Sequence, residues 1–120
     1  MRMNPEKVLT IAIPAYNASK FLPKCLRSLV DSNELERMEV LVIDDGSKES
    51  QDEVVRPYID RFPQSIQMIH KENGGHGDAV NSGLTYATGK YFKVVDSDDW
   101  VDEDALHKIL EVLRHMEEDA

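Results

Sequence analysis

The chain has 120 residues, with 14 Lys plus Arg against 23 Asp plus Glu, and therefore a formal net charge of −9. This balance argues against nucleic acid as a partner, because binding a phosphate backbone requires a basic surface. The single cysteine, Cys25, excludes an intramolecular disulfide and a multi-cysteine zinc site. No stretch approaches the roughly 18 consecutive apolar residues of a membrane span. We therefore expect one soluble cytoplasmic domain.

The hydrophobic pattern changes its period along the chain, and each change predicts a new element. Val8–Ile13 is a short β-branched run, which is typical of a buried parallel strand. From Ser19 the period becomes helical, and a second strand is expected at Glu39–Ile43. The segment Val54–Phe62 then predicts another amphipathic helix, with a kink or a split at Pro57.

Two further strands and two further helices are expected in the second half of the chain. Their ranges are Ile66–His70, Asp78–Thr88, Tyr91–Val95 and Asp104–Met116, in the order strand, helix, strand, helix. The helix over Asp78–Thr88 has a narrow face of small residues that would let it lie close to a sheet, and Gly89 is expected to be its C-cap. The order βαβαβαβα predicts an α/β, Rossmann-like fold, with a mostly parallel sheet and helices on both faces.

Polar residues follow all four predicted strands. They are Pro14–Asn17, Asp44–Ser47, His70–Gly77 and Asp96–Trp100. Each segment alone is typical of a turn with a helix cap, since Asp, Asn, Ser and Gly are common turn residues. Ligands of open α/β sheets bind beyond the carboxyl ends of the strands, so four such segments at one edge favour a binding site.

The acidic segment after the fourth strand carries the strongest chemical signal. Asp96, Asp98 and Asp99 place three carboxylates within four residues, an arrangement that costs stability unless a cation or solvent relieves it. Oxygen ligands of this kind suit Mg²⁺ or Mn²⁺, whose remaining ligands are commonly water and substrate phosphates. The alternative is a solvated acidic loop before the last helix.

Other strand-end residues leave two interpretations open. In the turn at Asp44 and Asp45, one acid can cap the turn while the other accepts hydrogen bonds from a base or a ribose. Tyr16 can stack on a planar ring or pack at the sheet edge. The glycine run Gly74–Gly77 permits close backbone approach to a ligand, and His76 is either a donor to a phosphate or sugar hydroxyl or an ordinary exposed histidine.

Four ordered motifs together resemble the inverting glycosyltransferases of family 2, which have the GT-A fold. The motifs are Thr10–Asn17, Val42–Ser47, Asn73–Gly83 and Gly89–Asp99, and the resemblance covers about residues 8 to 113. It implies that the first-strand loop and the acid after the second strand hold the nucleoside, and that the D-x-D segment holds the metal and the diphosphate. The expected nucleotide-binding residues are Pro14, Ala15, Tyr16, Asp44, Asp45, Gly75, His76, Asp96, Ser97 and Asp98, and the expected metal ligands are Asp96, Asp98 and Asp99.

The resemblance also implies a reaction. A nucleotide-diphosphate sugar, with a UDP-sugar favoured, would donate its sugar with inversion to a hydroxyl of a carbohydrate or lipid-linked acceptor, with Mg²⁺ or Mn²⁺ as cofactor and a role in cell-wall or polysaccharide biosynthesis. Such transferases are usually more than twice as long. We therefore expect residues 1–120 to be the donor-binding part, inactive or weakly active alone, with the catalytic base beyond Ala120 and the full-length protein in the cytoplasm or at the inner face of the membrane.

Two other classes remain open at this point. A receiver-type signalling domain has a similar length and binds Mg²⁺, but it carries its acidic pair after the first strand, where this chain has Pro14, Ala15 and Tyr16. A nucleotide-binding module without turnover is the third hypothesis. A sheet of four strands that ends at a helix would leave an edge uncovered, so we also expect self-association or reduced stability.

Overall fold

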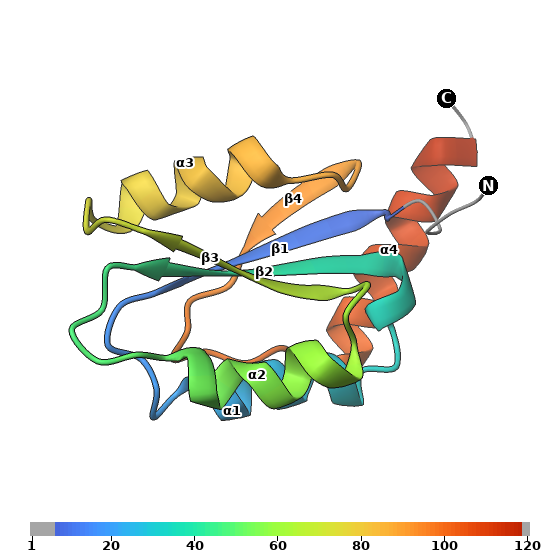
Figure 1. Ribbon diagram of the computed structural model, residues 1–120. Helices are drawn as coiled ribbons and strands as arrows, with labels where there is room; N and C mark the ends of the chain where they lie inside the picture. Colours follow the sequence, from blue (N-terminus) through green and yellow to red (C-terminus); the bar gives the residue numbers. More distant parts are fainter. Residues whose placement is uncertain (1–6, 119–120) are drawn as a thin grey trace.

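The computed structural model describes residues 7–118, which form a four-stranded sheet with helices on both faces (Figure 1). The elements are β1 (Leu9–Ala15), α1 (Leu22–Asp31), the short 3₁₀ helix η1 (Leu35–Arg37), β2 (Met38–Asp45), α2 (Asp52–Arg61), β3 (Ile66–Lys71), α3 (His76–Tyr86), β4 (Tyr91–Val94) and α4 (Glu103–Glu118). This confirms the expected α/β order. Within the described residues, no helix is both long enough and apolar enough to span a bilayer.

The sheet order places β1 at the point where the chain changes direction. All three strand pairings are parallel, in the order β3-β2-β1-β4. The chain moves outward from β1 to β3, and α3 then carries it back across the sheet to β4 on the other side of β1. The carboxyl ends of β1 and β4 therefore form a topological switch point, where open α/β sheets bind their ligands.

The sheet is buried on both faces, which explains the continuous hydrophobic runs of its central strands. Ile11 and Ile13 of β1 belong to the larger core, on the face covered by α1, α2 and α4. Ala12, together with Ile43 and Ala79, belongs to a smaller core under α3 on the opposite face. Figure 1 shows α3 alone on its side of the sheet, with α1 and α2 on the other.

The small-residue face of α3 allows the close approach that its sequence predicts. A Cβ added at Gly83 would lie 2.9 Å from Ala12 Cβ and 2.9 Å from Ile43 Cδ1. The expectation that Gly89 is the C-cap was wrong, because α3 ends at Tyr86 and its C-cap is Ala87, which has an extended conformation. Gly89 instead lies against β1, where an added Cβ would approach the Thr10 nitrogen to 2.7 Å, so close packing and not helix capping requires this glycine.

Pro57 does not split the second helix. A single helix, α2, runs from Asp52 to Arg61 through Pro57. The carbonyl that loses its donor to the proline ring belongs to Glu53 in the first turn, and both residues lie on the exposed side of the helix. Water can satisfy that carbonyl, so the helix tolerates the proline.

Candidate functional site

An open cavity lies at the switch point between β1 and β4. Its volume is about 400 Å³, and it is lined by Pro14, Tyr16, Asn17, Ala18, Phe21, His76, Asp96, Ser97 and Asp98. These residues come from the end of β1, the start of α3 and the loop after β4. The structure therefore brings together six of the residues that the sequence predicts to bind a nucleotide: Pro14, Tyr16, His76, Asp96, Ser97 and Asp98.

Four predicted nucleotide-binding residues do not line this cavity. Ala15, Asp44 and Asp45 are the buried last residues of β1 and β2, and they belong to strands instead of loops. Gly75 precedes α3 and has a φ of 93°, a conformation that L side chains rarely adopt.

The acidic loop after β4 brings three carboxylates together, and two of these residues, Asp96 and Asp98, line the cavity. Single oxygens of Asp96, Asp98 and Asp99 all lie within 4.8 Å of one another, and all three residues are exposed. The backbone folds them together through a turn in which the Asp99 amide donates to the Asp96 carbonyl at 2.9 Å. Hard oxygen donors at this spacing fit Mg²⁺ or Mn²⁺.

The negative charge of this loop raises the pKa of a neighbouring thiol, that of Cys25. Cys25 is fully buried on α1, and its Sγ lies 3.9 Å from the Asp96 carbonyl oxygen. Burial in the first place, and then the three carboxylates of the acidic loop, raise the pKa of Cys25 to about 12. Cys25 is therefore a neutral core residue and not a nucleophile.

His76 connects the start of α3 to the acidic loop. Its Nε2 lies 3.1 Å from Asp96 Oδ1, and both side chains are more than half exposed. The ring therefore stands at the cavity wall with one nitrogen directed to the loop that would hold a metal. The amino-acid sequence alone could not distinguish this position of His76 from that of an ordinary exposed loop histidine.

Asp45 holds the glycine-rich segment in place. Its Oδ1 accepts hydrogen bonds from Lys71 Nζ at 2.8 Å and from the Gly74 amide at 2.9 Å, and its Oδ2 accepts from the Gly75 amide at 2.9 Å. Burial by itself would raise the pKa of this carboxyl, but the Lys71 ammonium and the two glycine amides outweigh it and hold the pKa below its usual value. The carboxylate thus fixes the entry to α3.

Asp44 caps the turn that follows β2. Its Oδ1 accepts hydrogen bonds from the Ser47 amide and from Gln51 Nε2, each at 3.0 Å. Gly46 within this turn has a φ of 71°, and an added Cβ would lie 2.5 Å from the Asn73 nitrogen. The sequence did not show which of the two adjacent acids, Asp44 or Asp45, caps the turn. The structure shows that it is Asp44.

Gln51 is a functional support that sequence reasoning missed. Its side chain is fully buried, and its Oε1 accepts from the Ala18 amide at 2.6 Å while its Nε2 donates to the Ala15 carbonyl at 3.2 Å. It ties the loop after β1, which lines the cavity, to the turn after β2. No pattern in the sequence separates Gln51 from the solvent-exposed polar residues before it.

Comparison with known proteins decides the family. The family model described as "Glycosyl transferase family 2" matches residues 10–120. The chain belongs to this family. The resemblance seen in the four sequence motifs is thereby confirmed, and the residues that carry it are the strand ends described above.

Related proteins of the family are glycosyltransferases. The chain is 34% identical over 96 residues to "Glycosyltransferase GlyA" of Streptococcus pneumoniae, covering 80% of this chain and 14% of that protein. It is 35% identical over 99 residues to "Uncharacterized glycosyltransferase YibD" of Escherichia coli, covering 82% of this chain and 28% of that protein. The chain thus spans well under half the length of these relatives.

Solved structures share the fold. TarS from S. aureus, in complex with UDP-GlcNAc, superposes with a TM-score of 0.80 at 27% identity over 90% of this chain and 31% of that one. The mannosyltransferase PcManGT from Pyrobaculum calidifontis, in complex with GDP-Man and Mn²⁺, gives a TM-score of 0.73 at 25% identity over 82% of this chain and 30% of that one. The expected GT-A, Rossmann-like fold is therefore confirmed.

Proposed function

We propose that this chain is the donor-binding part of a metal-dependent family 2 glycosyltransferase. It binds a nucleotide-diphosphate sugar, with a UDP-sugar favoured, for inverting transfer of the sugar to an acceptor hydroxyl. The observation that carries the proposal is the cavity at the switch point, where Tyr16, His76 and the acidic loop face a common space. The UDP-GlcNAc complex of TarS supports the choice of nucleotide.

The acidic loop would hold the metal ion. Asp96, Asp98 and Asp99 supply hard oxygen donors within 4.8 Å of one another, and the Mn²⁺ complex of PcManGT supports a divalent ion. When bound, such an ion offsets the negative charge that develops on the departing diphosphate. It also allows an acidic protein to hold an anionic donor.

Other side chains orient the donor. Tyr16 is 46% exposed and lines the cavity directly after β1, beside Pro14, so its ring can stack on the base. His76 can donate a hydrogen bond to a phosphate oxygen at the start of α3. Asp44 and Asp45 act mainly by fixing the two neighbouring loops, and a nucleoside would meet an Asp45 carboxylate that already accepts several hydrogen bonds.

The acceptor hydroxyl would attack the anomeric carbon on the face opposite the diphosphate, with loss of its proton to a general base. We assign no base among these residues. We further propose that the acceptor is a carbohydrate or a lipid-linked molecule. The full-length protein would then act in the cytoplasm or at the inner membrane face. The relative named "Minor teichoic acid biosynthesis protein GgaB" from Bacillus subtilis, 28% identical over 102 residues, is consistent with a cell-wall polymer.

Calorimetric titration tests donor binding. We expect UDP-GlcNAc or another UDP-sugar to bind the chain with Mn²⁺ and to bind at least about tenfold more weakly with EDTA, because the diphosphate then faces bare carboxylates. Asp98→Asn should reproduce the loss, whereas Asp104→Asn, an exposed acid in the first turn of α4, should bind as the wild type does. Equal binding with and without metal, or no response to UDP-, GDP- and dTDP-sugars, contradicts the proposal.

The receiver hypothesis does not fit the strand order. In receiver domains the third strand lies beside the first, whereas here β4 lies beside β1 and β3 is at the far edge.

A nucleotide-binding module without turnover would pass the calorimetric test. It is distinguished from an enzyme part by assaying transfer in a longer protein that contains this chain.

A further inference from the structure

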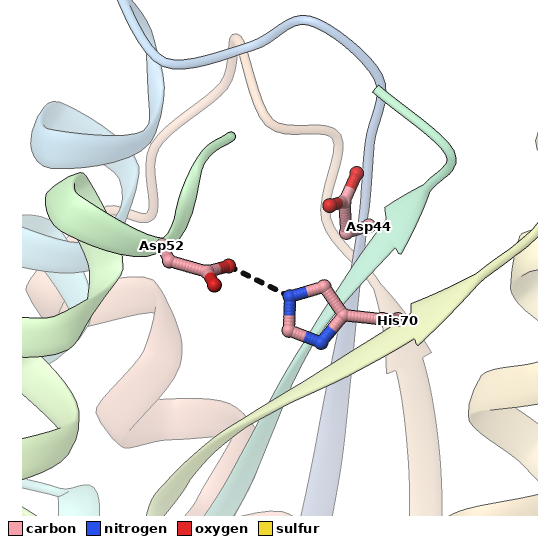
Figure 2. A group of neighbouring side chains, drawn as sticks. All are labelled: Asp44, Asp52 and His70. Carbon is pink, nitrogen blue, oxygen red and sulfur yellow. Dashed lines mark hydrogen bonds and ion pairs between the residues drawn. The ribbon is translucent and has the colours of Figure 1, made fainter. Parts of the chain in front are cut away.

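A second cluster of side chains lies on the other side of β1 from the acidic loop. It contains Asp44 at the end of β2, Asp52 at the start of α2 and His70 in β3. One carboxylate oxygen from each aspartate and one ring nitrogen of the histidine lie within 4.8 Å of one another. Figure 2 shows Asp52 and His70 directed toward each other, with Asp44 to one side of this pair.

The sheet register places two of these residues together. Asp44 of β2 and His70 of β3 are directly paired in the parallel ladder, so their side chains leave the same face of the sheet. Asp52 reaches them from the first residue of α2, which packs against β3 on that face. Three elements of regular structure therefore position the three groups.

Asp44 supplies an unusual feature, a buried carboxylate oxygen without a donor. The residue is only 7% exposed, and its Oδ1 accepts both of its hydrogen bonds, from Ser47 and from Gln51. Its Oδ2 has no hydrogen-bond partner among residues 7–118. Buried polar atoms of this kind are rare and commonly indicate a ligand or an ion.

The charge of the cluster is also uncompensated. In the described part of the chain, no Lys or Arg makes an ion pair with Asp44 or Asp52, although the adjacent Asp45 is paired with Lys71. Arg56 lines the same pocket as Asp52 and His70 but makes no ion pair with the cluster, and the basic group in contact with it is His70, whose Nε2 lies 2.7 Å from Asp52 Oδ1. The cluster therefore contains two carboxylates and a single imidazole as their basic partner.

We propose that Asp44, Asp52 and His70 form a second divalent-metal site, selective for a borderline transition metal such as Zn²⁺. Mixed imidazole and carboxylate donors suit Zn²⁺, whereas Mg²⁺ prefers oxygen ligands and retains its water. The ion takes the place of the direct contact between His70 Nε2 and Asp52 Oδ1. Water completes the coordination on the exposed side of the site.

The required movement is small and falls on exposed side chains. Zn²⁺ lies about 2.1 Å from nitrogen and oxygen ligands, so two ligand atoms on one tetrahedral ion are roughly 3.4 Å apart. The His70–Asp52 contact must therefore open slightly, and both of these side chains must move toward the Asp44 oxygen. The side chains of His70 and Asp52 are 57% and 40% exposed and are free to adjust, while Asp44 stays fixed by its turn.

Thermal unfolding with Zn²⁺ alone tests this site without any nucleotide. The reference is the full chain carrying Asp98→Asn, which disables the acidic loop. We expect Zn²⁺ to raise its midpoint of unfolding, since an ion that binds only the folded state stabilises it. Adding His70→Gln should weaken the Zn²⁺ affinity at least about tenfold and abolish the shift, because a direct ligand is lost.

His76→Gln in the same reference protein is the matched control, because it removes a histidine that likewise contacts an aspartate, Asp96. It should leave the Zn²⁺ response intact. Circular dichroism without metal checks that His70→Gln folds, and Asp52→Asn provides a second variant from a different element. A response that survives His70→Gln, that disappears with His76→Gln, or that is absent from the reference protein overturns the proposal, whatever the outcome of the nucleotide titrations.

Discussion

At the scale of single residues, the neighbours Asp44 and Asp45 show how one dipeptide serves two purposes. Asp44 caps its own turn, whereas Asp45 binds the Lys71 ammonium and the amides of Gly74 and Gly75. Their side chains leave opposite faces of β2, so each meets a different part of the chain. Order at the cavity therefore depends on contacts that reach from β2 in both directions.

Asp45→Asn should destabilise the chain, and the loss should depend on pH. Removing a buried charge that accepts several hydrogen bonds costs on the order of 1 to 3 kcal/mol. Since the pKa of Asp45 in the folded state lies below its unfolded value of about 3.9, its stabilising effect is present above that value and is lost as pH falls through the folded pKa.

Urea unfolding of Asp45→Asn beside the wild type measures this effect. The two proteins should differ most near neutral pH and converge in acid, below the pKa of the folded carboxyl. Asp78→Asn is the control, because Asp78 is the exposed second partner of Lys71 and should contribute less. A difference between wild type and Asp45→Asn that is independent of pH would show that the carboxylate charge has no stabilising role.

At this scale the sequence predicted candidate site residues by their type, but it could not predict their contacts. Asp96, Asp98 and Asp99 could be predicted to gather because they are almost consecutive, and their geometry confirms it. The partners of Asp45 could not, because Lys71 and Gly75 lie 26 and 30 residues away. Only the folded sheet brings such distant groups into hydrogen-bond range.

At the scale of elements, hydrophobic periodicity predicted the four described strands and the four α-helices, because each strand is a short apolar run, with β1 and β2 buried on two faces, while each helix buries one stripe. It could not give the strand order, since the period contains no information on which strands are neighbours. It also misread Gly89, because a glycine that ends a helix and a glycine that lies against a backbone look alike in sequence. Contact with Thr10 reveals which it is.

Gly83→Val tests the close packing of α3 on the sheet. Ala12 and Ile43 leave no room for a branched side chain, so we expect a loss of about 1 to 3 kcal/mol in the free energy of unfolding, measured in urea. Gly77→Ala in the same helix is the control. An added Cβ there meets nothing within 4 Å, so helix propensity should leave stability unchanged or raised. Equal tolerance of both substitutions would contradict the packing.

At the scale of the whole molecule, the described sheet has two edges, since β3 and β4 each pair on one side only. Unpaired strand edges favour pairing with another chain. The sequence already led to this expectation, and the strand order specifies which strands are concerned. Sedimentation at increasing concentration should therefore detect a dimer fraction that grows with concentration.

A charge on the edge should reduce this association. Gln67→Lys places a lysine on the exposed side of β3, and natural sheets use edge lysines to block such pairing. Gln64→Lys adds the same charge in the exposed loop before β3 and should have no effect. A chain that stays monomeric at all concentrations contradicts the expectation, and equal effects of both lysines would assign any change to net charge alone.

The buried thiol of Cys25 has a consequence of its own. It is the only cysteine in the chain, it is fully covered, and its pKa of about 12 keeps it in the unreactive protonated form. An alkylating reagent can therefore modify it only when the fold opens enough to expose the thiol. The rate of that modification reports how often the packing around Cys25 on α1 opens.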